Sequence, residues 1–271
     1  MNEDAIIRKL RRRAPLIGDD CAVLRPPKNH DLLFTTDFSI ENVHFTRTSP
    51  PEEIGYRALA RSLSDIAAMG GASLYCLVSI ALAPWTTGRW IDAFYRGIHK
   101  LLRKTKTQLA GGDISHANQL VCDVMVCGSV PTGKALLRSG AVPGDHIYVS
   151  GPLGGWHHKR ATVPRLDIGR KLLGKATSCM DISDGLALDL HRLCLASSAA
   201  AELDNIPLLP AATIEQALHD GEDYELVYTA PPRVRVPGIR IGTITKGKPG
   251  ALRFQGKQLP PVGYDHIQHR S

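Results

Sequence analysis

Apolar segments of strand length alternate with amphipathic segments of helix length along most of the chain, and this alternation limits the fold more than any other feature. Runs or strict alternation of apolar residues predict strands, whereas a 3.6-residue apolar period predicts helices. Strands separated by helices in both halves favour an α/β protein with α+β layers, in which helices cover sheets. The predicted strands are 16–25, 31–37, 74–83, 119–131, 146–151, 178–182, 224–230 and 239–245, and the predicted helices are 3–13, 51–69, 87–104, 165–173 and 184–198.

The chain length of 271 residues suffices for one large or two modest domains. A turn-rich stretch, KALLRSGAVPGD, lies between the strand expected at 119–131 and the strand expected at 146–151. We therefore predict two domains, 1–140 and 141–271. The longest apolar run, 74–85, is shorter than the roughly 18 residues that a membrane helix needs, so we expect no contact with a membrane.

Cysteine usage and the N-terminal sequence indicate a reduced, cytoplasmic protein. The six cysteines form no C-x-x-C pair and lie mostly in apolar runs, so neither a disulfide framework nor a zinc site is expected. The N-terminus, MNEDAIIRKLRRRAP, lacks the apolar region of a secretory signal.

The net charge of +7 has two readings. It fits solvated basic helix faces, and it fits equally an anionic small substrate. Aromatic residues make up only 6% of the chain, so nucleic acid is not an expected partner.

Seven aspartates lie beside glycines or at the ends of predicted apolar strands. Such positions place carboxylates at strand ends and tight turns, where glycines let a ligand approach the backbone. Carboxylates gathered in one place repel one another unless cations neutralise them, and Mg²⁺ prefers carboxylate, phosphate and water oxygens. Each aspartate alone is better explained as a turn residue or, as at Asp184, a helix N-cap. The seven together predict a nucleotide site with several Mg²⁺ ions. The seven are Asp19, Asp20, Asp37, Asp65, Asp113, Asp181 and Asp184.

The segment GSVPTGK at 128–134 matches the P-loop pattern only in part. Ala135 stands where a P-loop has the Ser or Thr that holds Mg²⁺, and turn residues follow instead of a helix. The sequence also lacks the G-x-S-x-G elbow of hydrolases and the H-R-D motif of protein kinases. We therefore expect neither a P-loop nor a protein-kinase site.

Eight blocks occur in the order seen in the thiamine-monophosphate kinase family. They are IGDDCAVL, TTDFSIENVHF, SLSDIAAMGG, AGGDIS, GSVPTGKALLRSGAVPGDHIYVSG, MDISDGLALDL, DGEDYELVYT and VGYDHI, and they span residues 17 to 267. A chain that resembles this family is expected to have the two-domain fold of the aminoimidazole-ribonucleotide synthetase superfamily, with an N-terminal domain whose sheet forms a homodimer. The resemblance also implies ATP-dependent phosphorylation of thiamine monophosphate to thiamine diphosphate.

The resemblance implies roles for individual positions. Metal ligands or their supports, with Mg²⁺ as the ion, are expected at Asp20, Thr35, Thr36, Asp37, Asp65, Asp113, Asp181 and Asp184, with Asp19 beside them. Contacts with ATP are expected at Gly112, Asp113, Arg138, Ser183 and Tyr95. Contacts with thiamine monophosphate are expected at His44, Glu222 and Tyr264.

The implied reaction needs no catalytic base. A phosphate oxygen of the acceptor is already anionic at pH 7, so no proton has to be removed from it. Two like charges about 4 Å apart repel by about 4 kcal/mol at an effective dielectric constant of about 20, and several such pairs arise when a monophosphate meets a triphosphate. Mg²⁺ ions would remove this repulsion and support direct in-line transfer, without a phosphoenzyme.

The second domain is shorter than the family pattern. After VSGPLGG the sequence reads WHHKRATVPRLDIGRKL where the family continues into a long helix, and the stretch 190–220 is also trimmed. Two alternatives therefore stay open: a non-catalytic ATP-binding regulatory homologue, and a kinase of a related anionic acceptor. Reactive cysteines that would favour sister families are absent from the N-terminal helix and from the C-terminal HRS.

Overall fold

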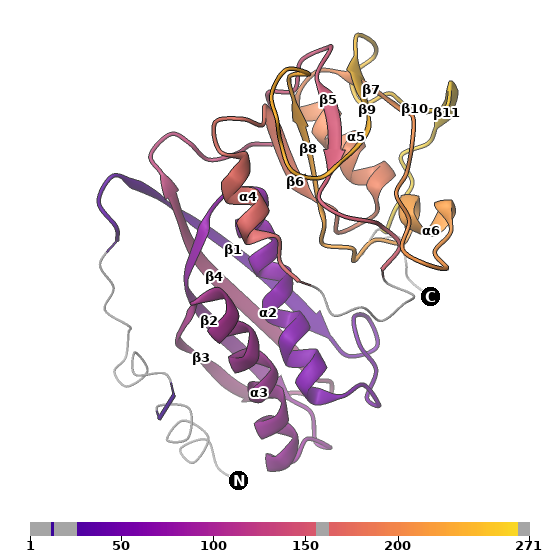
Figure 1. Cartoon of the computed structure of the whole chain (residues 1–271). Coiled ribbons are helices and arrows are strands. Elements are labelled where there is room, and N and C mark those ends of the chain that lie inside the picture. The colour runs from indigo at the N-terminus through magenta and orange to yellow at the C-terminus, as the bar shows by residue number, and fades with distance from the viewer. Residues whose placement is uncertain (1–11, 14–25, 156–162, 265–271) are drawn as a thin grey trace. The chain divides into compact units, whose positions relative to one another are not determined.

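The structure is a computed structural model that describes residues 12–13, 26–155 and 163–264. These residues form two compact units (Figure 1). The first unit contains the described residues up to 66 together with 72–132, and the second contains 67–71 and the described residues from 133 onward. No described helix is long and apolar enough to cross a membrane.

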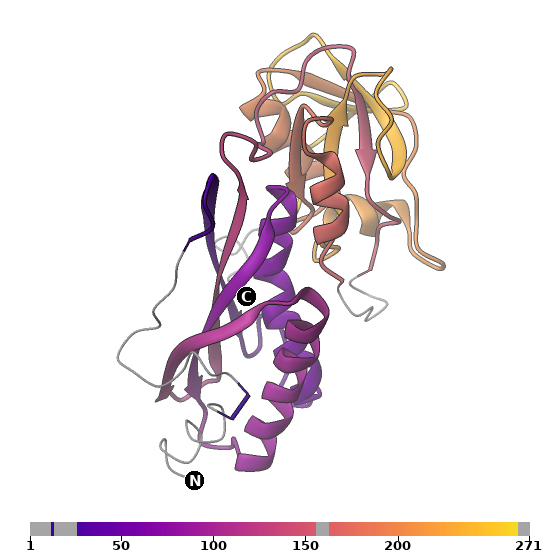
Figure 2. The same ribbon diagram turned by 60° about the vertical axis from the view of Figure 1, so that its left-hand side comes forward.

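The first unit is built on a four-stranded sheet with the order β1–β4–β2–β3. Its strands are β1 (His30–Ile40), β2 (Ala72–Leu82), β3 (Gln108–His116) and β4 (Val121–Pro131). β4 runs antiparallel to β1 and β2, and β3 runs parallel to β2. Parallel strands need a crossover connection, and helices α2 (Pro51–Ala68) and α3 (Gly88–Thr105) provide these connections and lie along one face of the sheet (Figures 1 and 2).

Alternation along β1 decides which face each side chain takes. Thr35 and Asp37 face α2, where their polar partners lie. Leu32, Phe34 and Phe38 project from the opposite face and are 40%, 66% and 58% exposed. Because successive residues of a strand point to opposite faces, one strand presents a polar row to the helices and an apolar row on its other side.

Two glycines set the close packing of α2 against α3. A Cβ at Gly97 would lie 1.9 Å from the carbonyl oxygen of Glu52, and a Cβ at Gly55 would lie 2.1 Å from the carbonyl oxygen of Phe94. Each helix therefore presents backbone to its neighbour at the crossing. This approach buries Phe94 and Leu59 completely between the helices and the sheet.

The second unit contains a seven-stranded sheet with the order β11–β10–β7–β9–β5–β8–β6. Neighbouring strands are antiparallel except for β7 and β10. The strands are β5 (His146–Val149), β6 (Ser178–Asp181), β7 (Ala200–Leu203), β8 (Leu226–Ala230), β9 (Ile239–Thr245), β10 (Leu252–Phe254) and β11 (Lys257–Leu259). The helices are α4 (Leu166–Leu172), α5 (Leu186–Ala196) and α6 (Ile214–His219). Apolar residues of α5, among them Leu190 and Leu193, form one core with Ile147, Val227 and Ile241 of the sheet.

The N-terminus of α5 differs from the sequence-based alternative that Asp184 is a helix N-cap. The N-cap is Gly185, with a φ of 110° and no side-chain capping bond, so Asp184 is not the cap. Asp189, inside the first turn of the helix, accepts the N–H groups of Ser183 and Asp184 instead. This leaves the Asp184 carboxylate outside the capping arrangement.

The mixed α/β class is confirmed, and each predicted strand or helix inside the described residues corresponds to an observed one. The segments predicted at 3–13 and 16–25 lie largely outside the described residues. Strands β3, β7, β10 and β11 and helix α6 were not predicted. The five cysteines in the described part of the chain are free and buried, as expected for reduced core residues.

Replacing Gly97 by Ala should destabilise the first unit. Ala normally favours a helix interior over Gly by roughly 0.5–1 kcal/mol, but here its Cβ would overlap the Glu52 carbonyl, and overpacking typically costs about 1–3 kcal/mol. We expect urea denaturation to give a lower free energy of unfolding for Gly97→Ala. Arg96→Ala, at an exposed position of the same helix, should change it by less than about 0.5 kcal/mol. A stabilising effect of Gly97→Ala would contradict the close approach.

Candidate active site

Asp37 on β1 and Asp65 on α2 interact on the helix-covered face of the first sheet. The Thr35 hydroxyl donates a hydrogen bond to the Asp65 carboxylate. The pKa of Asp37 is raised to about 6, mainly by burial and then by the negative charge of Asp65. Arg61 and a hydrogen bond from Ser62 offset only part of this rise. At neutral pH the Asp37 carboxylate therefore carries negative charge that its surroundings do not fully compensate.

A second set of polar side chains lies on the opposite face of this sheet, at neighbouring positions on adjacent strands. The Thr36 hydroxyl donates to Asp123 Oδ1 on β4 at 2.5 Å. The strand register pairs Asp123 with Ser79 on β2, and Ser79 with Asp113 on β3. Because directly paired residues project from the same face, Asp113, Ser79 and Asp123 share it. Asp123 was missed by the sequence reasoning, although an aspartate inside the apolar strand VCDVMVCGSV is a signal that could have identified it.

The predicted Mg²⁺ ligands of the first unit occur as small groups. Within the described residues, no three His, Cys, Asp or Glu side chains are placed to hold a metal ion by themselves. Asp19 and Asp20 lie outside the described part of the chain. Mg²⁺ is commonly held by one or two carboxylates together with phosphate and water oxygens, so such groups fit a cation shared with a nucleotide. The complete ligand set stays a prediction.

Two predicted ATP contacts of the first unit have structural roles of their own. Gly112 has a φ of 153°, and a Cβ there would lie 1.9 Å from the carbonyl oxygen of Val78, so the pairing of β3 with β2 itself requires glycine. Tyr95 is only 6% exposed and packs edge-on against Phe94, with 5.4 Å between ring centroids. Contact of either residue with ATP stays a prediction.

Arg138 lies in the exposed stretch that follows β4. Its carbonyl oxygen accepts the Ser197 hydroxyl at 3.1 Å, and its side chain is exposed. Gly128 to Pro131 continue β4, and no helix follows over 132–145. This geometry confirms that GSVPTGK is not a P-loop.

His44 lies in the turn after β1 in a fixed orientation. Its ring Nδ1 accepts the backbone N–H of Ile40 at 3.0 Å, and the backbone N–H of His44 donates to the Ile40 carbonyl at 2.9 Å. Because Nδ1 acts as an acceptor, the ring proton lies on Nε2. Its predicted contact with the substrate would therefore use Nε2–H as a donor.

In the second unit, Asp184 belongs to a network around the start of α5. Arg192 Nη1 lies 2.5 Å from Asp184 Oδ2 and 2.8 Å from Asp189 Oδ1. Asp189 is fully buried, and its Oδ2 accepts the N–H groups of Ser183 at 3.0 Å and Asp184 at 2.9 Å. Burial raises the pKa of Asp189 to about 6. Asp181, 5% exposed, ends β6 just before this network. The sequence reasoning identified Asp181 and Asp184 but did not foresee the network that Asp189 and Arg192 form.

Three blocks that are far apart in the sequence meet at this network. The backbone N–H of Glu222 donates to the Ser183 carbonyl at 2.7 Å, and that of Tyr264 donates to the Asp184 carbonyl at 2.9 Å. The structure therefore brings the two predicted substrate contacts of the second unit next to a predicted ATP contact and a predicted metal ligand.

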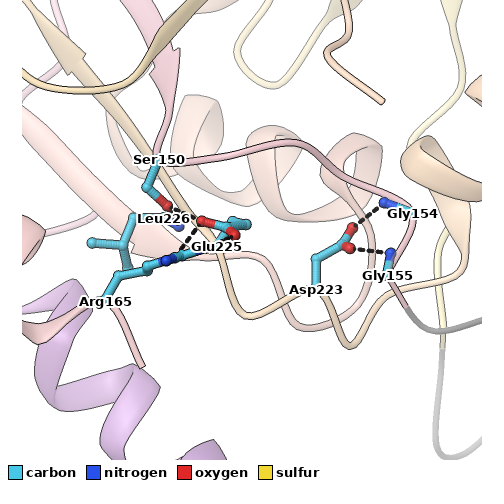
Figure 3. Close-up of polar contacts among 7 residues, drawn as sticks. All are labelled: Ser150, Gly154, Gly155, Arg165, Asp223, Glu225 and Leu226. Atoms are coloured by element: carbon cyan, nitrogen blue, oxygen red, sulfur yellow. Dashed lines mark hydrogen bonds and ion pairs between the residues drawn. The ribbon is translucent and has the colours of Figure 1, made fainter. Parts of the chain in front are cut away.

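Glu225, three residues after Glu222 in the DGEDYELVYT block, is held by a second set of contacts (Figure 3). It is 4% exposed and accepts Arg165 Nε at 2.7 Å together with a second bond from the same guanidinium. The Ser150 hydroxyl also donates to it at 2.5 Å. Two residues earlier, Asp223 accepts the N–H groups of a Gly-Gly turn. Neither acidic residue was among the predicted site residues.

Replacing Asp37 by Asn should stabilise the protein at high pH. The folded-state pKa of Asp37, about 6, exceeds the ordinary value of 3.8, so this carboxyl favours folding less and less as pH rises from about 4 through 6. We expect Asp37→Asn to be about 1–3 kcal/mol more stable than the wild type at pH 8 and equally stable at pH 4, in urea unfolding followed by circular dichroism. Asp167→Asn, at a side chain that is 80% exposed, should change neither value by more than about 0.5 kcal/mol. Equal stabilities of Asp37→Asn and wild type at pH 8 would contradict the raised pKa.

Comparison with known proteins places this arrangement in a family. The AIR synthase related protein, N-terminal domain family matches residues 18–130. Thiamine-monophosphate kinase of Haemophilus influenzae is 32% identical over 308 aligned positions, which cover 93% of this chain and 91% of that protein. The crystal structure of thiamine-monophosphate kinase from Stenotrophomonas maltophilia matches with a TM-score of 0.84 and 31% identity, over 96% of this chain and 98% of that one. A structure of AaThiL complexed with AMPPCP and TMP matches with a TM-score of 0.82 and 28% identity, over 97% and 96% of the two chains. With its fold and its ordered blocks in agreement, this chain belongs to the thiamine-monophosphate kinase family.

Proposed function

We propose that the protein transfers the γ-phosphoryl group of ATP to thiamine monophosphate and forms thiamine diphosphate and ADP. The observation that carries this proposal is the similarity, over 97% of the chain, to AaThiL in complex with AMPPCP and TMP. AMPPCP is an analogue of ATP, so that neighbour is a complex with a phosphoryl donor analogue and with TMP. Binding of donor and acceptor together is what direct transfer requires.

The transfer itself makes small demands on side-chain chemistry. A phosphate oxygen of thiamine monophosphate bonds to the γ-phosphorus while the bond from phosphorus to the β–γ bridging oxygen breaks, and ADP leaves. The attacking oxygen is anionic at neutral pH, so no residue has to act as a general base. Catalysis therefore depends on positioning and on reducing the repulsion between two polyanions.

The acidic groups fit a role in holding Mg²⁺. Asp37 and Asp65 carry negative charge that Arg61 offsets only in part, and Thr35 adds a hydroxyl oxygen on the same face of the sheet. Thr36 offers its hydroxyl beside Asp123 on the opposite face. Hard oxygen ligands of this kind suit Mg²⁺. We assign the Mg²⁺ ligands to Asp20, Thr35, Thr36, Asp37, Asp65, Asp113, Asp181 and Asp184. When bound, Mg²⁺ neutralises the charge of the phosphates.

The remaining site residues divide between the two substrates. For ATP we propose contacts from Gly112, Asp113, Arg138, Ser183 and Tyr95. For thiamine monophosphate we propose contacts from His44, Glu222 and Tyr264. An exposed guanidinium such as that of Arg138 suits bidentate contact with phosphate, and an aromatic ring such as that of Tyr264 suits the cationic thiazolium.

We further propose that residues 1–140 bind ATP and Mg²⁺ and form the dimer, and that 141–271 complete the site. The exposed apolar side chains of Leu32, Phe34 and Phe38 on one face of β1 support a homodimer formed through this sheet. The free, buried cysteines support a reducing, cytoplasmic location.

Enzyme assays test the proposed reaction directly. Purified protein with ATP, Mg²⁺ and thiamine monophosphate should form thiamine diphosphate, separated by chromatography. Asp37→Asn and Asp65→Asn should each lower kcat/KM by about 10²–10³-fold, because each removes charge that would hold the cation at the phosphates. The exposed control Asp167→Asn should retain full activity.

Other results would support the alternatives. Binding of ATP and Mg²⁺ without turnover would favour a regulatory homologue, and turnover only with a different phosphorylated acceptor would favour a related kinase. Full activity of both aspartate variants would contradict their metal roles.

Analytical ultracentrifugation tests the dimer. The wild type should sediment as a dimer, and the double substitution Phe34→Ser and Phe38→Ser should give a monomer with an unchanged circular dichroism spectrum, because it removes the exposed apolar row. Leu137→Ser, at a 53% exposed position of the second unit, should remain dimeric. A monomeric wild type would contradict the proposed interface.

A further inference from the structure

Glu222 stands in a segment whose backbone is held in an unfavourable conformation. Gly221, Glu222 and Tyr224 have φ values of 71°, 52° and 50°. Glutamate and tyrosine adopt such left-handed conformations only when surrounding contacts hold them there. The orientation of the Glu222 side chain therefore depends on what fixes its neighbours.

Backbone hydrogen bonds fix one side of this segment. The N–H of Glu222 donates to Ser183, and the N–H of Tyr224 donates to the Ile182 carbonyl at 2.8 Å. A Cβ at Gly221 would lie 2.4 Å from the Ser183 carbonyl oxygen, so the two segments are in direct contact. These bonds fix the backbone at Glu222 and Tyr224. Residue 223, which lies between them, has a different contact.

The side chain of Asp223 makes this contact (Figure 3). Its Oδ2 accepts the N–H of Gly154 at 3.1 Å, and its Oδ1 accepts the N–H of Gly155 at 2.6 Å. Each oxygen takes one donor, so an amide side chain cannot replace both bonds. The donor turn is itself fixed, because Gly154 has a φ of 90° and a Cβ there would lie 2.6 Å from the Cβ of Ala212.

Within the described residues, the contacts of the Asp223 carboxylate are the backbone N–H groups of Gly154 and Gly155, and none of them is a cation. Burial raises its pKa to about 6, and the negative charges of Glu225 and Asp220 raise it as well. Arg165 in the same part of the unit pairs with Glu225. Groups whose pKa is shifted by burial together with neighbouring charges are more frequent at functional sites than elsewhere.

We propose that Asp223 is a positioning residue that, by tying the turn to Gly154 and Gly155, fixes the Glu222 carboxylate for contact with thiamine monophosphate. The amino group and the cationic thiazolium ring of thiamine both suit a carboxylate partner. The inference rests on the proposed function, because it takes thiamine monophosphate as the acceptor. Asp223 acts through Glu222 and does not touch the reacting atoms.

Steady-state kinetics with the full-length protein test this role. Asp223→Asn should raise KM for thiamine monophosphate about tenfold while kcat and KM for ATP change less than about twofold. Asp145→Asn is the matched control, because Asp145 is 2% exposed and also ties its unit together, accepting the N–H of Val142 at 3.1 Å and the Thr177 hydroxyl at 2.7 Å. This control should lower the melting temperature but leave KM for thiamine monophosphate unchanged.

A double-mutant cycle separates positioning from a general loss of stability. If Asp223 acts through Glu222, the double variant Glu222→Gln with Asp223→Asn should have the same KM for thiamine monophosphate as Glu222→Gln alone. If the increases in KM for thiamine monophosphate of the two single variants multiply in the double variant, or if Asp223→Asn leaves this KM unchanged, the inference is overturned and the proposed function stands. If Asp223→Asn does not fold, Asp223→Glu, which keeps both acceptor oxygens but displaces them by one methylene, takes its place in the cycle. No turnover of thiamine monophosphate by the wild type would overturn both the function and the inference.

Discussion

Negative charge that is only partly compensated is the constraint on which the first unit depends. Asp37 faces Asp65 at the junction of β1 and α2, where burial removes much of the water that would otherwise stabilise the Asp37 carboxylate. Arg61, 5% exposed, supplies a single positive charge nearby. Such an arrangement lowers the stability of the isolated fold and at the same time creates a strong preference for a cation. The reaction we propose needs this property, since two phosphorylated molecules must approach each other.

Carboxylates in the second unit serve a different purpose. Asp189 is held by two backbone N–H groups and Arg192, Glu225 by Arg165 and a serine hydroxyl, and Asp223 by the N–H groups of a turn. The bonds of Glu225 and Asp223 join segments that are far apart in the sequence, whereas those of Asp189 hold the start of α5. The second unit therefore uses acidic residues as internal anchors for loops, and Glu222, a predicted substrate contact, stands next to one of these anchors, Asp223.

The length of this chain bears on how much of the family architecture the fold needs. The alignment with the Haemophilus influenzae relative has 308 positions, more than the 271 residues of this chain, so it includes positions that this chain lacks. The fold nevertheless matches the Stenotrophomonas maltophilia enzyme with a TM-score of 0.84. Loops tolerate shortening because their length adds little to the free energy of folding. The eight blocks that carry the predicted ligands are present in this chain.

The sequence by itself determined the class of fold, the main strands and helices, and the aspartates to examine, because hydrophobic periodicity and Gly-flanked carboxylates are local features. It did not determine β3, whose sequence QLAGGDISH has no apolar alternation and becomes a strand through pairing with β2. Nor did it identify Asp123, Asp189 or Asp223 as partners of the site. Asp123 and Asp223 contact residues 87 and 69 positions away, so only the tertiary structure, through strand register and loop closure, brings those atoms within hydrogen-bonding distance. The bonds of Asp189 are local, but they depend on where helix α5 begins, which the sequence did not settle.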